Sequence, residues 1–151
     1  MSEIEVRPAK PSDYDAIKAV VDEWWGAPVQ GGLTRLFLDH FHNTSFVVYA
    51  HGHLVAFLVG FLSQGQRDLA YIHYVGVAPT FRRSGVGREL YRRFFSLVHS
   101  AGRTRVAAIT SPRNTRSIAF HTAMGFRVSE PIADYDGPGA DRVYFDRLID
   151  E

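Results

Sequence analysis

A strand that leads into a basic glycine loop and then into an amphipathic helix is the feature that most restricts the fold of this chain. The strand is predicted over Leu69 to Val77, an apolar run with a proline shortly after it. The loop reads Arg82-Arg83-Ser84-Gly85-Val86-Gly87. From about Gly85 to Ala101 the apolar residues fall on one helical face, and Gly102 follows as a helix-ending glycine. Strand, loop and helix in this order favour a mixed α/β fold.

The glycine loop has the chemistry of a pyrophosphate site. A helix N-terminus exposes unpaired N–H groups and a positive dipole end, and glycines let a diphosphate approach the backbone. A dinucleotide motif would need a glycine where Leu90 stands, and a nucleotide-triphosphate loop would need Gly-Lys-Ser/Thr where Arg88 and Glu89 follow Gly87. Neither motif fits, and the alternative to a ligand site is a glycine turn before a solvated basic helix.

The rest of the chain extends this pattern to the order β, α, α, β, β, β, α, β, α, β, β. It predicts a mixed, mostly antiparallel sheet of six or seven strands with about four helices, in a single domain over residues 1–151. The other predicted strands and helices follow in chain order. They are a strand at Ile4 to Val6, a helix that begins after the N-cap Ser12 and stops near Trp24-Trp25-Gly26, a helix from Leu33 to His42, strands Phe46–Ala50, Leu54–Leu62 and Val106–Ile109, a helix from Asn114 to Met124, and strands Phe126–Val128 and Val143–Leu148.

Composition narrows the function classes. The formal net charge is +1, too small to argue for bulk electrostatic binding to nucleic acid or to a membrane. The chain has no cysteine, which removes disulfides, thiolate metal sites and a cysteine nucleophile. Its seven histidines lack metal-ligand spacing with carboxylates, so no metal is expected. The first ten residues contain no apolar run and Leu54–Leu62 is too short to span a bilayer, so the expected location is the cytoplasm.

Two motif blocks resemble those of the GNAT N-acetyltransferase superfamily. Val75-Gly76-Val77-Ala78-Pro79 followed by the loop from Arg82 to Gly87 is similar to the superfamily's acetyl-CoA-binding signature. Asn114, followed by Gly125-Phe126, is similar to its second block. The resemblance implies a splayed central strand pair, with a V-shaped gap between the strands Leu69–Val77 and Val106–Ile109. It also implies direct transfer of an acetyl group from acetyl-CoA to a primary amine of a small molecule or peptide, in a ternary complex.

The resemblance also implies which residues would hold acetyl-CoA. Main-chain groups of Val75 and Val77 would bind the pantetheine and thioester region, although both valines also suit a core. Arg83 to Arg88 would wrap the pyrophosphate, and Asn114 would contact the pantetheine arm or cap its own helix. The full predicted set is Val75, Val77, Arg82, Arg83, Ser84, Gly85, Val86, Gly87, Arg88 and Asn114.

Two histidines are the candidate catalytic residues. The superfamily's usual tyrosine acid maps onto His121, which would protonate the departing CoA thiolate or would only pack between sheet and helix. The frequent glutamate base is missing from Val106 to Ile109, which leaves His73 as the candidate base, or else as a buried structural histidine. Strand alternation predicts that Tyr71 shares a face with His73 and that Tyr74 points the other way.

The acceptor would meet Trp24, Trp25 and Tyr135. The two tryptophans end a helix and cannot both enter one core, so at least one is expected to be exposed, while Tyr135 lies in the loop Asp134–Pro138 whose acids could attract an ammonium group. A polar hairpin loop and core tryptophans are the plainer interpretation. Two other function classes stay open, a non-catalytic acyl-CoA-binding module and a nucleotide-binding regulatory domain. The expected partners are the amine acceptor and, as in other members of the superfamily, a second copy in a homodimer.

Overall fold

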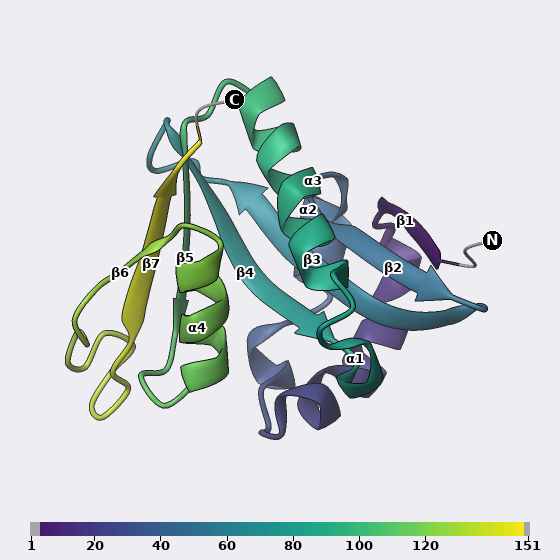
Figure 1. Ribbon diagram of the computed structural model, residues 1–151, viewed down its shortest axis with the longest axis horizontal. Helices are drawn as coiled ribbons and strands as arrows, with labels where there is room; N and C mark the ends of the chain where they lie inside the picture. The colour runs from purple at the N-terminus through teal and green to yellow at the C-terminus, as the bar shows by residue number, and fades with distance from the viewer. Residues whose placement is uncertain (1–3, 150–151) are drawn as a thin grey trace. The chain divides into compact units, whose positions relative to one another are not determined.

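The predicted order of strands and helices is confirmed by the computed structural model, which describes residues 4–149 (Figure 1). Within these residues the fold has seven strands and four α-helices, with short 3₁₀ turns between some of them. In chain order they are β1 (Ile4–Pro8), α1 (Tyr14–Trp25), α2 (Leu36–Phe41), β2 (Phe46–Ala50), β3 (His53–Leu62), β4 (Leu69–Val77), α3 (Val86–Ser100), β5 (Arg105–Thr110), α4 (Thr115–Ala123), β6 (Arg127–Val128) and β7 (Val143–Leu148).

The strands form one mixed sheet with the hydrogen-bonded order β1-β2-β3-β4-β5-β7-β6. The β1–β2, β2–β3, β5–β7 and β6–β7 ladders are antiparallel, whereas β4 and β5 run parallel. A helix-containing crossover joins the parallel pair, as that geometry requires. The prediction of a mostly antiparallel sheet of six or seven strands with about four helices is therefore confirmed.

The parallel β4–β5 ladder is short. It covers three residue pairs, Leu69↔Arg105, Ala70↔Val106 and Tyr71↔Ala107. For the described residues this is where the pairing of the two strands ends, although β4 continues to Val77. The two strands are therefore not paired along their full length, as predicted, and the V-shaped gap between them stays a prediction.

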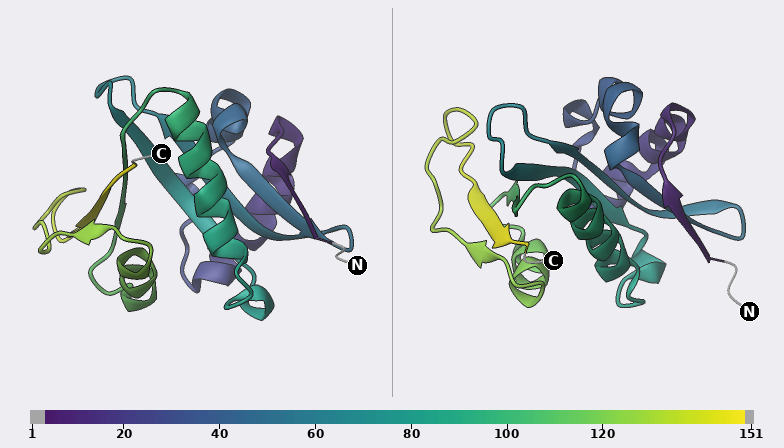
Figure 2. Two further views of the ribbon diagram at one scale, coloured as in Figure 1. Left: turned by 45° about the horizontal axis from the view of Figure 1, so that its top comes forward. Right: turned by 90° about the horizontal axis from the view of Figure 1, so that it is seen from above.

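The chain divides into two compact units, and β4 and α3 contribute residues to both. The first unit holds residues 4–61 and 72–97. In it, α1 and α2 lie on one face of the sheet and α3 lies on the other (Figure 2). The core beneath α1 and α2 includes Ile17, Val21, Val47, Phe57 and Val59. The predicted single domain over residues 1–151 stays a prediction.

The second unit holds residues 62–71 and 98–149, with β5, α4, β6 and β7. Val106, Ala108 and Phe145 are buried in it, and alternation on the two strands places them on one face. Helix α4 contributes His121 to this core, where its ring stacks on Phe145.

The structure contains no helix among residues 4–149 that is long and apolar enough to span a bilayer. In the same residues, no group of three or more His, Asp or Glu side chains is arranged to hold a metal ion.

Candidate functional site

The glycine loop between β4 and α3 presents backbone to its surroundings. Two left-handed backbone torsions on either side of Ser84 shape it, since Arg83 has φ 70° and Gly85 has φ 92°. A Cβ at Gly85 would meet no atom within 4 Å, so the surface above it is open. The Ser84 hydroxyl accepts a hydrogen bond from the Val86 N–H at 3.3 Å and so begins α3. The backbone at the N-terminus of α3 is therefore not covered by a side chain at Gly85, as an anion site needs.

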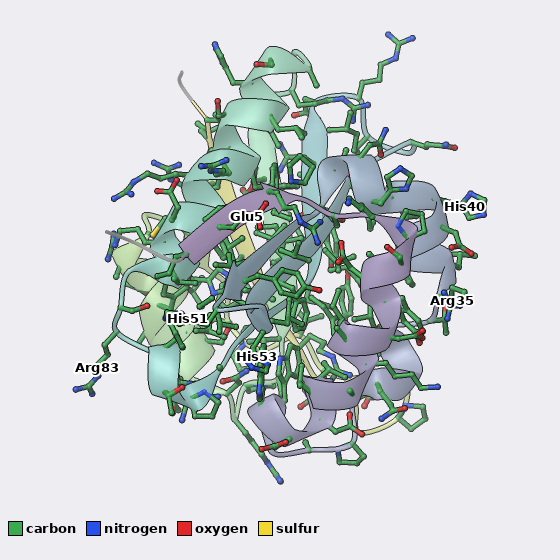
Figure 3. All side chains as sticks on the ribbon, turned by 90° about the vertical axis from the view of Figure 1, so that its right-hand side faces the viewer. Glu5, Arg35, His40, His51, His53 and Arg83 are labelled. Atoms are coloured by element: carbon green, nitrogen blue, oxygen red, sulfur yellow. The ribbon has the colours of Figure 1, made fainter. Side chains whose placement is uncertain are left out.

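The arginines of the loop have different environments. The Arg82 guanidinium donates to the carbonyl of Trp24, so it ties the loop to the end of α1. Arg83 is exposed and extends away from the ribbon (Figure 3). Further along α3, Glu89 pairs with Arg92 and Arg93 at 3.2 Å each. Arg83 is therefore the loop arginine whose geometry best suits contact with an approaching phosphate.

Two adjacent residues of β4 bind the α1–α2 connection, residues 26–35. His73 Nε2 lies 2.6 Å from the carbonyl oxygen of Gly32, and the Tyr74 hydroxyl donates to the carbonyl of Val29 at 2.6 Å. The His73 and Tyr74 rings are 4.6 Å apart between centroids. The prediction that Tyr74 points away from the face of His73 is wrong, because both side chains reach the same connection.

The carboxylate of Asp22, in the last turns of α1, shapes this connection from the other side. Its Oδ1 accepts from the backbone N–H groups of Val29 and Gln30 at 2.8 and 2.7 Å, and its Oδ2 accepts from the Gln30 amide at 3.0 Å. Desolvation, the largest single effect, raises the pKa of Asp22, but the three hydrogen bonds together outweigh it and hold that pKa below its usual range. Asp22 thus fixes the backbone that His73 and Tyr74 contact.

The two tryptophans separate as expected. Trp24 is 8% exposed and stacks on Phe57 at 6.0 Å, so it belongs to the core. Trp25 is 37% exposed, stacks on Tyr74 at 4.9 Å, and donates its indole N–H to the carbonyl of Val75 at 3.0 Å. A carbonyl oxygen has two lone pairs, so this bond leaves Val75 able to accept a second donor.

Tight packing fixes the neighbouring position of β4. A Cβ at Gly76 would lie 2.5 Å from Cε2 of Phe57 and 3.3 Å from Cε3 of Trp24, which is closer than packed side chains approach. Glycine at this position lets the indole and the phenyl ring cover β4 directly. The strand between His73 and Val77 is therefore packed directly against aromatic side chains.

His73 is a neutral histidine with a defined tautomer. The Gly32 carbonyl can only accept, so Nε2 carries the hydrogen and Nδ1 carries the lone pair. The ring is half-buried and stacks on Phe37 at 4.1 Å with an interplanar angle of 15°. Desolvation lowers the pKa of His73, while the bond to Gly32 opposes that shift. The imidazole therefore stays neutral at physiological pH and keeps a basic nitrogen.

Asn114 caps α4. Its side-chain oxygen accepts from the Ser117 N–H at 3.2 Å, and its amide donates to Thr110 Oγ1 at 3.1 Å. The capping role that the sequence left open is therefore present. Contact of Asn114 with a pantetheine arm stays a prediction.

His121 lies in the core of the second unit. The residue is 6% exposed, and its ring stacks on Phe145 at 4.0 Å between centroids with an interplanar angle of 6°. Nδ1 lies 2.8 Å from the carbonyl of Ser117, so Nδ1 donates and Nε2 carries the lone pair. Desolvation lowers the pKa of His121 to about 4, opposed by that hydrogen bond.

The aspartate side chains of the loop between β6 and β7 have partners within the same loop. Tyr135 is 45% exposed, in keeping with a residue that meets a ligand. Asp136 pairs with Arg142 at 2.9 Å, and Asp134 accepts from the Gly139 N–H at 2.8 Å. The acids of this loop are engaged within it, which weakens the expectation that they attract an ammonium substrate.

The predicted site residues therefore fall into two groups. The first unit brings together Trp25, His73, Val75 and the loop that begins at Arg82, through contacts with the end of α1 and with the α1–α2 connection. The second unit contains the other predicted site residues, Asn114, His121 and Tyr135.

Sequence reasoning missed Asp22, Tyr74, Gly32 and Phe37. Asp22 follows Val20 and Val21 and resembles any acid on a helix surface, so only its place shortly before the Gly26-Ala27-Pro28 break could have drawn attention to it. The contacts of His73 join residues 41 positions apart, and no local pattern reports them.

Comparison with known proteins identifies the family. The profile described as the acetyltransferase (GNAT) family matches residues 12–126, and this chain belongs to that family. Aminoglycoside N(6')-acetyltransferase type 1 from Salmonella typhimurium is 27% identical over 120 residues, which covers 74% of this chain and 83% of the relative.

Solved structures share the fold. Ard1 from Thermoplasma volcanium superimposes with a TM-score of 0.83 at 23% sequence identity and covers 99% of both chains. The acetyltransferase yncA from Salmonella typhimurium, solved with its cofactor acetyl-CoA, has a TM-score of 0.76 at 19% identity, covering 99% of this chain and 95% of that one. The expectation of an acetyltransferase fold and family is confirmed.

Proposed function

We propose that this protein transfers an acetyl group from acetyl-CoA to a primary amine of a small molecule or peptide by direct attack. Membership of the GNAT family carries this proposal, together with the open glycine loop at the start of α3. The aminoglycoside acetyltransferase relative and the acetyl-CoA complex of yncA support an amine acceptor and this donor. The chain has no cysteine, so an acyl-cysteine intermediate is excluded and direct transfer is the simplest course.

The residues of the glycine loop suit acetyl-CoA. Gly85 leaves open space over the backbone, and the N-terminus of α3 offers N–H groups for a pyrophosphate. Arg83 lies exposed beside it. Acetyl-CoA supplies an acetyl thioester, the electrophile of the reaction. In this proposal the loop from Arg82 to Arg88 holds the pyrophosphate, and the backbone of Val75 and Val77 receives the thioester arm.

His73 is the proposed general base. Its Nδ1 carries a lone pair and its lowered pKa keeps it unprotonated, the form that accepts a proton from the attacking amine. Its hydrogen bond to Gly32 fixes the ring, as a base needs for productive geometry. Val75 is two residues further along the same strand.

The acid role for His121 stays a prediction, and its surroundings favour the alternative of packing. Neutral imidazole that donates through Nδ1 has a lone pair on Nε2 and no proton there to give. Because burial lowers the pKa of His121 to about 4, the imidazolium form is scarce at neutral pH. A thiol has a reference pKa of about 8.5, so the leaving thiolate can take its proton from water.

The donor is tested by calorimetry with matched glycine variants. Gly85→Val and Gly102→Val both place a branched side chain at a positive φ, 92° and 79°, with open space around the Cβ. We expect Gly85→Val to weaken acetyl-CoA binding at least tenfold, about 1.4 kcal/mol, because its side chain covers the backbone at the start of α3. Gly102→Val, at the other end of that helix, should lose comparable stability and keep its affinity.

Transfer itself is tested by thiol release with acetyl-CoA and a panel of amines. Release that depends on the added amine, together with an acetylated product by mass spectrometry, is the expected result. Tight binding of acetyl-CoA with no acetylated product from any amine would favour the non-catalytic acyl-CoA-binding class. Binding of ATP or NAD in preference to acetyl-CoA would contradict the donor assignment.

A further inference from the structure

Six half-buried or exposed rings of the first unit form a continuous row of ring contacts. Neighbouring rings lie between 4.1 and 6.0 Å apart by their centroids. In order, the row is Trp25, Tyr74, His73, Phe37, Phe41 and Phe61. These residues come from α1, β4, α2 and β3, so tertiary packing builds the row and no single element contains it.

Hydrogen bonds to backbone carbonyls orient three rings of the row. The indole N–H of Trp25, the hydroxyl of Tyr74 and the Nε2–H of His73 each donate to a main-chain carbonyl. The polar hydrogens of these three rings are thus already used. What the row offers to a ligand is aromatic surface and the lone pair of His73 Nδ1.

Trp25 forms the exposed end of the row. It stacks on Tyr74 with an interplanar angle of 17° and keeps 37% of its surface exposed. An exposed tryptophan fixed by both a hydrogen bond and a stacked ring is a preorganised contact surface. Its partner Val75 belongs to the stretch of β4 that we propose receives the thioester, so a flat group resting on Trp25 would lie beside that stretch.

Of the three carboxylates of α1, two have partners and Glu23 alone is exposed without one among the described residues, which is little negative charge for a polycation. Asp22 is bound to the backbone of the α1–α2 connection, and Asp15 pairs with Arg35 at 2.9 Å. An aminoglycoside carries several ammonium and hydroxyl groups, which need carboxylates and amides to replace water. An arylalkylamine needs an aromatic surface for its ring and, while still protonated, gains from a cation–π contact.

We infer that the acceptor of this enzyme is an amine attached to a flat aromatic group, which packs on Trp25 at the end of the aromatic row. This inference rests on the proposed function and names the substrate class of that site. It separates the protein from its aminoglycoside-modifying relative, because the recognising surface is aromatic and two of the three acids of α1, Asp15 and Asp22, are engaged.

The first test compares acceptors. We expect kcat/KM for phenethylamine and tryptamine to exceed that for kanamycin and spermidine at least tenfold under saturating acetyl-CoA. Phenethylamine should also quench the tryptophan fluorescence excited at 295 nm, with no turnover required. Kanamycin or spermidine as the better acceptor, or no binding of phenethylamine, would overturn the inference.

Variants then locate the contact. Trp25→Ala should raise the KM for phenethylamine about tenfold, and Trp25→Phe should recover part of it because a ring face returns. Ile132→Ala, at a position 38% exposed on the β6–β7 loop, is the matched control and should leave KM unchanged. An unchanged KM in Trp25→Ala would also overturn the inference.

Calorimetry with acetyl-CoA distinguishes a failure of the proposed function from a failure of the aromatic-acceptor inference. If acetyl-CoA binding is lost in Gly85→Val and retained in the parent, and at least one amine is acetylated, the proposed function stands whichever class of acceptor is preferred. A panel that then favours polycations rejects the aromatic-acceptor class alone. If the parent does not bind acetyl-CoA, the proposed function fails first.

Discussion

Two histidines, one in each compact unit, have nearly the same contacts but differ in how well they suit a catalytic role. His73 and His121 both stack on a phenylalanine, at 4.1 Å and 15° and at 4.0 Å and 6° respectively. Both lie against a backbone carbonyl, at 2.6 and 2.8 Å. In both, burial lowers the pKa. A list of interactions alone would not tell them apart.

They differ in exposure, in the nitrogen that keeps the lone pair, and in their neighbours. His73 is half-buried and has its lone pair on Nδ1. The next residues of its strand contact the exposed Trp25. His121 is 6% exposed, has its lone pair on Nε2, and lies among the phenylalanines of a core. The comparison teaches that a neutral, oriented histidine is a catalytic candidate only where a ligand can reach its basic nitrogen.

Removal of the ring of His73 should have the largest effect. We expect His73→Ala to lower kcat about 100-fold or more, the range that a positioned base supplies. Since burial lowers the pKa of His73, the loss of activity caused by a proton on Nδ1 should appear below about pH 6.5. Steady-state rates between pH 5 and 9 with the best acceptor of the panel check both points. Acetyl-CoA affinity by calorimetry is the control, and an unaltered kcat would assign His73 to structure alone.

The buried histidine, His121, should make the free energy of unfolding depend on pH. The folded state binds a proton on His121 only below about pH 4, whereas the unfolded chain binds one below about 6.5. Stability from this group is therefore present above pH 6.5 and is lost as the pH falls toward 4, by about 3 kcal/mol in total. Urea unfolding of the parent and of His121→Phe across pH 4–7 measures it. Both proteins contain His73, so parallel curves would mean that His121 carries no such shift.

Substitutions at neutral pH should have the smallest effect and sharpen the comparison further. His121→Ala should lose about 2 kcal/mol of stability, because it leaves a cavity against Phe145. His121→Phe should recover most of that loss and keep kcat within about threefold of the parent, since a packed ring is all that the position needs. A stable His121→Phe with kcat lowered tenfold or more would restore the acid role.

Much of the fold could be predicted because its signals are local. Glycines and prolines bound the strands and helices, apolar spacing separates the two kinds, and the Arg82–Gly87 loop lies where the sequence placed it. The site could be predicted only in part. The bond between Trp25 and Val75 joins residues 50 positions apart, and the contacts of Tyr74 break the period-two alternation on which its face was predicted.

The packing of aromatic rings over Gly76 also has a consequence for mutational tolerance. A methyl group there would lie 2.5 Å from Phe57 and would force the ring or the strand to move. In a saturation library selected for acetyl transfer, position 76 should therefore return glycine almost alone, although its backbone needs no unusual torsion. Alanine should reappear chiefly in clones that also carry a smaller residue at position 57. The two positions would then covary, and an alignment of natural relatives could be searched for that pair.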